Sequence, residues 1–297
     1  MFFTTTTNSD FYTDMNIAWP HLEGEVMGFI YFDNSGPAAS INSTVIDLLS
    51  WVQLMLNKGA LIDTVMFTEE QYYKMVSPET VLHAGRAEKI DGRHFASYGL
   101  GWFLYDYQGM KVIHHGGGLP GFHSKVVIVP EDSLGYVILA NELGGLVGAI
   151  ENKILDYHIG DAEKDWADLY LNYVNKGKDR EEERKTALDS SRIEGTSPSL
   201  ELKSYLGTYK DKMYGDAVIE MANGELFVTL VPAGELLSSP MSHWHYDTFS
   251  IDFKDPFLPK GLLSFSLNNK GEVDYFIIDV YSPDFHFQKL KFERISE

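Results

Sequence analysis

The residues of this chain best suited to chemistry lie together in the segment 113–122, which reads IHHGGGLPGF. Glycine weakens a strand unless another backbone or a ligand must approach closely, and four of these ten residues are glycine. A histidine beside such a stretch can offer a ring nitrogen to whatever lies against it. The pattern fits either a hairpin corner with two incidental histidines or a wall of a binding site.

The surrounding sequence predicts strands on both sides of this cluster. From Tyr98 the chain reads YGLGWFLYDYQGMKVIHHGGGLPGFHSKVVIVPEDSLGYVILANE. Turn signals at Gln108-Gly109, at the glycine cluster and at 130–133 separate three or four β-rich runs. We therefore expect adjacent antiparallel strands across 98–141.

This stretch resembles the serine β-lactamase-like family, which includes class C β-lactamases, DD-peptidases and related esterases. In that family a YGLGW-type strand is followed by a His-x-Gly strand, a Gly-Phe turn and a strand that ends in Asn. His115, Gly116 and Gly117 stand at the His-x-Gly positions. This triplet takes the place of the Lys-Thr-Gly of the penicillin-binding enzymes.

The resemblance implies a role for each of these residues. The strand would line the substrate cleft, with Gly116 and Gly117 against the substrate. His115 would contact the substrate or steady an acyl intermediate. The amide of Gly118 would donate to the oxyanion, an interaction typically worth a few kcal/mol in the transition state.

Two predicted helices lie upstream and agree with the resemblance. The segment from Gly36 resembles the family's "Ala-Gly-Gly, Ser-Thr, Asp-Leu, Trp" stretch. Thr44 with Asp47 is a variant capping box, and Gly59 suits a helix end. Apolar positions at helical spacing predict a wide buried face, formed by Val45, Leu48, Leu49, Val52 and Leu56. A second short helix is expected over 68–75, before Pro78.

The family's nucleophile motif is not found in these 297 residues. No serine is followed by a lysine three positions later, and Ser266–Lys270 is one residue too long. Tyr170-Leu171-Asn172 has the letters of the family's Tyr-x-Asn element but follows the glycine strand, so we interpret it as chance. The sequence thus looks like the C-terminal half of a serine hydrolase with an extra domain, without the half that carries nucleophile, lysine and tyrosine.

Two function classes follow. In the first, the chain is part of a hydrolase of peptide, β-lactam or ester carbonyl compounds, and the chain alone is inactive because acyl transfer needs an activated hydroxyl. The other half would be a separate chain, or would be lost through truncation or a mistaken start codon. In the second, the chain is a non-catalytic pseudoenzyme or a module that binds a small apolar ligand or a partner.

The composition limits the classes of partner that the chain is expected to bind. The net charge of −19 disfavours nucleic acids and anionic membranes, which attract basic patches. No run of residues approaches the length of a transmembrane helix, so no membrane insertion is expected. Without cysteine, disulfides and thiolate metal sites are excluded. Residues 1–20 show no signal peptide, although the family is often exported or periplasmic. We expect no cofactor and no metal.

The fold class predicted is α+β in three parts. Residues 1–160 would form a partial β-lactamase-like domain that ends in a helix after Asn141. Residues 161–199 would form a helical arm and linker. Residues 200–297 would form a small antiparallel barrel resembling the lipocalin-like domain appended to related hydrolases. Its expected strands are 206–210, 217–221, 226–230, 248–253, 262–266, 275–278 and 285–293.

Two further expectations concern the rest of the surface. His243, His245 and Asp247 alternate as metal ligands on a strand could, but the resemblance explains this segment as packing in the barrel. The family's sheet also uses strands from the absent half. The strands of 98–141 should therefore leave a sheet edge and an apolar face uncovered, which invites self-association or pairing with a separate N-terminal half.

Overall fold

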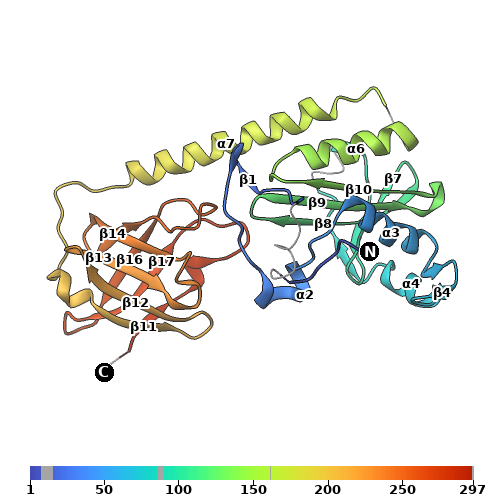
Figure 1. Cartoon of the computed structure of the whole chain (residues 1–297). Helices are drawn as coiled ribbons and strands as arrows, with labels where there is room; N and C mark the ends of the chain where they lie inside the picture. Colours follow the sequence, from blue (N-terminus) through green and yellow to red (C-terminus); the bar gives the residue numbers. More distant parts are fainter. Residues whose placement is uncertain (8–15, 86–89, 161, 296–297) are drawn as a thin grey trace. The chain divides into compact units, whose positions relative to one another are not determined.

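The computed structural model describes residues 1–7, 16–85, 90–160 and 162–295. The chain forms two compact units, Met1–Gly177 and Lys178–Glu297 (Figure 1). Antiparallel strands and packing helices build the first unit, and a closed antiparallel barrel builds the second. The predicted α+β class is confirmed.

A six-stranded antiparallel sheet forms the centre of the first unit, in the order β10-β9-β8-β7-β6-β5. Each strand pairs with its neighbour in the sequence, as the turn signals predicted. Gly116, Gly117 and Gly118 belong to β8, the longest strand of this sheet, and Gly121 lies in the turn that follows it. The strands are β5 (Thr80–Leu82), β6 (Ala96–Tyr98), β7 (Phe103–Tyr107), β8 (Met110–Leu119), β9 (Phe122–Val129) and β10 (Leu134–Ala140).

Two tight turns fix the register of the strand that carries the glycines. Gln108 and Gly109 both have positive φ, at 50° and 80°, so they form the type I′ turn between β7 and β8. Pro120 and Gly121 connect β8 to β9, and Gly121 has a φ of 76°. The space beside Gly121 is also closed, because a Cβ there would lie 2.3 Å from the Cβ of Pro20.

Helices cover both faces of the sheet. Helix α3 (Val45–Leu56) packs on one face with α4 (Glu69–Met75), and α6 (Leu146–Ile159) packs on the other (Figure 1). Thr44 caps α3 by accepting the amide of Asp47 at 3.2 Å, and α4 begins with a full capping box formed by Thr68 and Gln71.

One detail of α3 differs from the prediction. Val45 and Leu49 are 40% and 39% exposed, so the buried face is narrower than the apolar pattern indicated. The carboxylate of Asp47 is buried and accepts the amides of Phe2 and Phe3, at 3.2 and 2.7 Å. The N-terminal segment therefore lies against the start of α3.

Short elements complete the first unit, and a long helix leads out of it. They are β1 (His21–Leu22), β2 (Glu25–Val26), a 3-10 turn at Asp33–Ser35, α2 (Gly36–Ala39), β3 (Ala60–Leu61), β4 (Thr64–Val65) and a 3-10 turn at Pro130–Asp132. Helix α7 (Trp166–Ser190) buries Trp166 at its start and is mostly exposed along its charged remainder.

The second unit is an eight-stranded barrel closed by pairing of its first and last strands. Aromatic side chains fill its interior, including Tyr205, Tyr209, Phe249, Phe276 and Phe292. Its strands are β11 (Gly207–Asp211), β12 (Gly215–Ala222), β13 (Glu225–Leu230), β14 (Ser238–His245), β15 (Thr248–Ile251), β16 (Gly261–Leu267), β17 (Val273–Asp279) and β18 (Phe292–Arg294). Short 3-10 turns lie at Leu202–Tyr205, Val231–Ala233 and Phe287–Lys289.

Two details of the barrel were mispredicted. Strand β14 was missed, because its Ser-Ser-Pro start reads as a loop. The expected strand 285–293 is instead a 3-10 turn followed by the short β18, because Phe287 and Leu290 turn into the core. Among the described residues, no helix has both the length and the hydropathy needed to cross a membrane.

Candidate functional site

The glycine strand has an open side. Strand β8 pairs with β9 from Ile113 to Leu119, whereas its pairing with β7 stops at His114, which lies opposite Phe103. Beyond His114, the described strands therefore flank β8 on one side only. The His-Gly-Gly-Gly segment forms this half-open part of the strand.

The register determines which amides face the open side. In a two-residue hairpin the residues flanking the turn form a hydrogen-bonded pair, here Leu119 and Phe122. Hydrogen-bonded and non-hydrogen-bonded pairs then alternate, so Gly117 bonds to β9 while Gly116 and Gly118 do not. The N–H groups of Gly116 and Gly118 therefore point away from β9, toward the side that β7 leaves open.

The hairpin formed by β7 and β8 independently assigns the same amides to the open side. Tyr107 and Met110 flank the turn between β7 and β8, so they form the hydrogen-bonded pair there. Counting along that ladder makes His114 the last residue of β8 that bonds to β7. Successive amides of a strand point alternately to its two sides. After His114, the next amides of β8 that point toward the β7 side are therefore those of Gly116 and Gly118.

Steric contacts explain two of the three glycines. A Cβ on Gly117 would lie 2.6 Å from the Oγ of Ser124, and one on Gly116 would lie 3.2 Å from the carbonyl oxygen of Ser124. A Cβ on Gly118 would meet only Leu143, at 3.6 Å. The close approach at Gly116 and Gly117 is therefore made by β9, while Gly118 is exposed and unobstructed.

His115 uses both ring nitrogens within the sheet. Its Nδ1 lies 2.8 Å from the carbonyl oxygen of Gly116, and its Nε2 lies 3.2 Å from the hydroxyl of Tyr98. The ring also lies beside Phe103, with the centroids 5.5 Å apart. His115 is half-buried and directly precedes the glycines whose amides face the open side.

His114 has a different environment, although it is the next residue. Its ring stacks on Phe103 at 5.3 Å and meets Tyr105 edge-on at 5.2 Å. Burial, with smaller contributions from the charges of Lys125 and Arg93, holds the pKa of His114 well below its ordinary value. A neutral ring packed among aromatic residues is a core residue.

The charges behind this part of the sheet are paired. Lys125 on β9 contacts Glu151 on α6 at 3.0 Å, and Arg93 forms an ion pair with Asp91. Tyr105 donates a hydrogen bond to Glu151 at 3.4 Å. These pairs place little net charge beneath the glycine strand.

The alternating histidines of the barrel contact neighbouring backbone. His243 Nε2 lies 2.9 Å from the carbonyl of Tyr246, and His245 Nδ1 accepts the amide of Ile193 at 3.4 Å. The ladder shifts register between the two histidines. Asp247 accepts hydrogen bonds from Ser199 and Tyr205. These contacts fasten the linker to the barrel, and within the described ranges no group of three His, Asp or Glu side chains could hold a metal ion.

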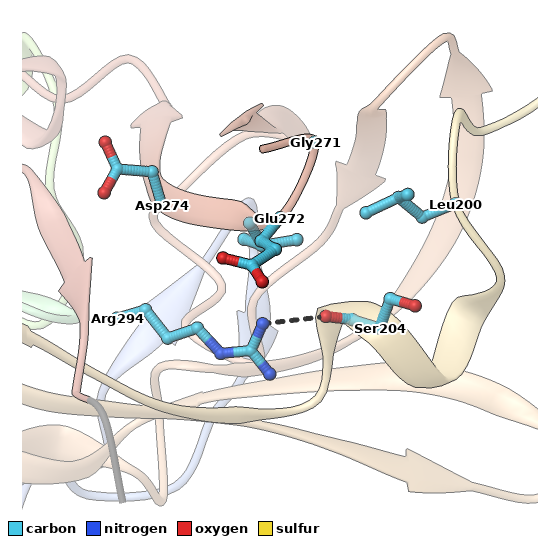
Figure 2. A pocket seen from close by; sticks show the side chains of 7 residues that line it. Leu200, Ser204, Gly271, Glu272, Asp274 and Arg294 are labelled. Atoms are coloured by element: carbon cyan, nitrogen blue, oxygen red, sulfur yellow. Dashed lines mark hydrogen bonds between the residues drawn. The ribbon is translucent and has the colours of Figure 1, made fainter. Parts of the chain in front are cut away.

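A pocket of about 540 Å³ lies on the barrel between the 3-10 turn at 202–205 and the start of β17 (Figure 2). Its cation, Arg294, donates to the carbonyls of Ser204 and Leu206, at 3.0 and 2.7 Å. The guanidinium thus ties the last strand to the segment that directly precedes the first strand. Glu272 and Asp274 also line this pocket, which contains no nucleophile–base pair.

The sequence analysis gave Tyr98 no role. Its hydroxyl reaches His115 from β6, two strands away from β8. The YGLGW pattern marked the strand, but only the sheet order shows that this tyrosine meets the histidine. His115 and Gly118 lie three residues apart on β8, and Tyr98 contacts His115.

Comparison with known proteins is consistent with this arrangement. Residues 4–160 match the family model "Beta-lactamase", and residues 191–294 match "Domain of unknown function (DUF3471)". The chain is 25% identical over 225 residues to "Unguisins hydrolase ungD" of Aspergillus violaceofuscus, and 26% identical over 133 residues to "Unguisins hydrolase ungD'" of Aspergillus campestris. These matches cover 66% and 42% of this chain, but only 37% and 24% of those relatives.

Among solved structures, the chain is similar to an octameric penicillin-binding protein homologue from Pyrococcus abyssi. The identity is 14% and the TM-score is 0.46, and the match covers 98% of this chain and 56% of that one. The family model covers more than half of this chain and includes the whole six-stranded sheet. The chain therefore belongs to the β-lactamase family of serine hydrolases.

Proposed function

We propose that this chain supplies a substrate-facing wall of a β-lactamase-like hydrolase that acts on peptide, β-lactam or ester carbonyl compounds. In this proposal the Gly118 amide donates to the oxyanion, while Gly116 and Gly117 line the substrate. His115 steadies the bound carbonyl group or acyl intermediate. The observation that carries the proposal is the register of β8, by which the Gly118 N–H points to the open side of the strand, three residues after His115.

We further propose that the 297-residue chain alone is inactive by the family mechanism. Acyl transfer by this route needs a hydroxyl whose proton is taken by a neighbouring base. No Ser-x-x-Lys occurs in this sequence. The nucleophile would then come from outside these residues, on another chain or on a preceding segment, and would meet the wall at the open side of β8.

We also propose a role for each of the three parts of the chain and name the partners that they could have. Residues 1–160 would hold the wall, residues 161–199 the arm and linker, and residues 200–297 the barrel. Self-association through the sheet unit is the alternative to a separate N-terminal half. A nucleic acid partner is disfavoured by the net charge of −19.

The non-catalytic alternative receives less support from the geometry. Capture of a small apolar ligand inside the barrel would need an unfilled interior. The rings of Tyr205 and Phe265 lie 4.7 Å apart, and those of Phe276 and Phe292 lie 4.8 Å apart, so aromatic side chains occupy that space. Binding without catalysis would therefore take place at the β8 wall.

Covalent labelling tests this proposal. The purified chain is incubated with a fluorescent penicillin and with a fluorophosphonate, and its intact mass is measured. A β-lactamase that retains Ser-x-x-Lys serves as the positive control. We expect labelling of the control and no mass increase for this chain. A stable adduct on any serine of this chain would overturn its proposed inactivity.

The hydrolase class has a separate test in the coding DNA upstream of Met1. We expect an in-frame Ser-x-x-Lys there, or on a neighbouring gene whose product co-purifies with this chain. If neither is found, the wall belongs to a pseudoenzyme.

A further inference from the structure

The hydrogen bonds of His115 determine which of its nitrogens carries the proton. The carbonyl oxygen of Gly116 can only accept, so the hydrogen of the 2.8 Å contact must belong to Nδ1. In a neutral imidazole the other nitrogen is then an acceptor. The partner of Nε2 must therefore be a donor, and the hydroxyl of Tyr98 lies 3.2 Å away.

Tyr98 is held in place by contacts independent of the histidine. Its backbone carbonyl accepts the amide of Glu79 at 3.0 Å, and its ring meets Phe103 edge-on at 4.6 Å. The next residue, Gly99, donates to the carbonyl of Trp102 at 2.8 Å. The hydroxyl is therefore presented from a fixed backbone, so it can orient the more open imidazole.

From this geometry we infer that Tyr98 is a positioning residue, which fixes the orientation of the His115 ring and, in the neutral imidazole, favours the tautomer with the proton on Nδ1. Its hydroxyl donates to Nε2, and Gly116 accepts from Nδ1, so the ring is fixed at both ends. The importance of this arrangement for substrates rests on the proposed function of the β8 wall. The hydrogen bonding itself does not.

One consequence concerns the charge of the wall. The penicillin-binding enzymes have a lysine at the position of His115. Here the imidazole of His115 stands in that place, with both of its ring nitrogens hydrogen-bonded within the chain. The wall therefore lacks, at this position, the ammonium group of the penicillin-binding enzymes.

Nitrogen NMR of the ligand-free full chain tests this inference. Histidine side chains are labelled with ¹⁵N, and the His115 signals are assigned by their loss in His115→Asn. In the native chain, at a pH high enough for the ring to be neutral, we expect Nδ1 to be protonated and Nε2 to be unprotonated. In Tyr98→Phe we expect the ratio of the two tautomers to shift about fivefold toward Nε2–H, which is the effect of one typical hydrogen bond.

Tyr73→Phe is the matched control. It removes a hydroxyl from the same unit, one that contacts Lys58 and not His115, so the His115 signals should stay unchanged. A native His115 with its proton on Nε2 would overturn the inference without any variant. An unchanged ratio in a folded Tyr98→Phe chain would overturn it as well. Because no substrate or nucleophile is involved, this result is independent of the labelling and DNA tests above.

Discussion

The two units of this protein differ in their strand edges, which are closed in the barrel and open in the sheet. In the barrel every strand has a neighbour on both sides, because β11 pairs with β18. In the sheet unit β5 and β10 each have one neighbour among the described strands, and β8 loses one of its neighbours beyond His114. A closed barrel leaves no edge for another strand, whereas an open sheet offers hydrogen bonds to a partner.

Exposed apolar side chains occur in both units, and in the sheet unit some of them lie near α3 and on an edge strand. Phe2 is 97% exposed and Ile46 is 74% exposed, and both lie near the start of α3, where the amide of Phe2 bonds to Asp47. Val81 on the edge strand β5 is 88% exposed. Clustered apolar exposure beside open edges is typical of an interaction surface. The proposed partner or second copy would therefore pair with the sheet unit rather than with the closed barrel.

Removing an aromatic ring from the barrel should have the largest effect on stability. Phe276 is fully buried and stacks on Phe292 at 4.8 Å, so Phe276→Ala should cost about 4 kcal/mol. If the units unfold separately, only the barrel transition will move in a urea titration followed by hydrogen exchange. Equal loss of protection in both units would refute their independence.

The glycines of β8 should differ in their tolerance of a side chain. Gly117→Ala places a methyl group 2.6 Å from the Oγ of Ser124 and should destabilise the sheet unit by about 2 kcal/mol. Gly118→Ala meets only ordinary contact and should change stability by less than about 0.5 kcal/mol. Denaturant midpoints of the two variants compare them directly, and equal midpoints would contradict the steric account.

The exposed patch at α3 should drive self-association if no other chain covers it. Ile46→Lys should weaken an association measured by sedimentation by roughly 1.5 kcal/mol, the value of burying one such side chain. Met213→Lys is the control, since Met213 is a 72% exposed apolar residue of the barrel. A chain that stays monomeric at high concentration and melts cooperatively would argue against an uncovered interface.

Acid should loosen the attachment of the linker to the barrel. Burial disfavours the charged form of Asp247, but hydrogen bonds from Tyr205 and Ser199 outweigh this, so its pKa lies below the ordinary 3.8. A lowered pKa contributes stability above about pH 3.8, and that contribution is lost as the pH falls through the folded value. Asp247→Asn should therefore flatten the acid dependence of the barrel's urea midpoint, while the exposed Asp252→Asn should leave it unchanged. A steep acid dependence retained in Asp247→Asn would assign it to other groups.

Local signals in the sequence predicted most of the fold. The Gln108-Gly109 turn, the cap at Thr44 and the alternation of apolar residues each act within a few positions, so one sequence reveals them. Strand β14 was missed because its Ser-Ser-Pro start has no such signal. The exposure of Val45 and Leu49 depends on what packs against α3, which lies outside any local pattern.

The residues of the candidate site likewise fall into those that the sequence identified and those that only the structure reveals. The resemblance supplied His115 and Gly118, because they follow one another along a single strand. It could not supply Tyr98, whose contact with His115 depends on the order of β6, β7 and β8 in the sheet. Nor could it show that Ser124 leaves no room for a side chain at Gly116 and Gly117 but does not obstruct Gly118. That difference depends on the register between β8 and β9.

Hydrogen exchange of individual amides in β8 tests the central claim most directly. The register predicts slow exchange for His115 and Gly117, which bond to β9, and fast exchange for Gly116 and Gly118, which face the open side. Backbone NMR of the native chain in D₂O resolves all four rates. A Gly118 amide as protected as that of Gly117 would mean that this N–H is already bonded within the chain, and the proposed oxyanion donor would be lost.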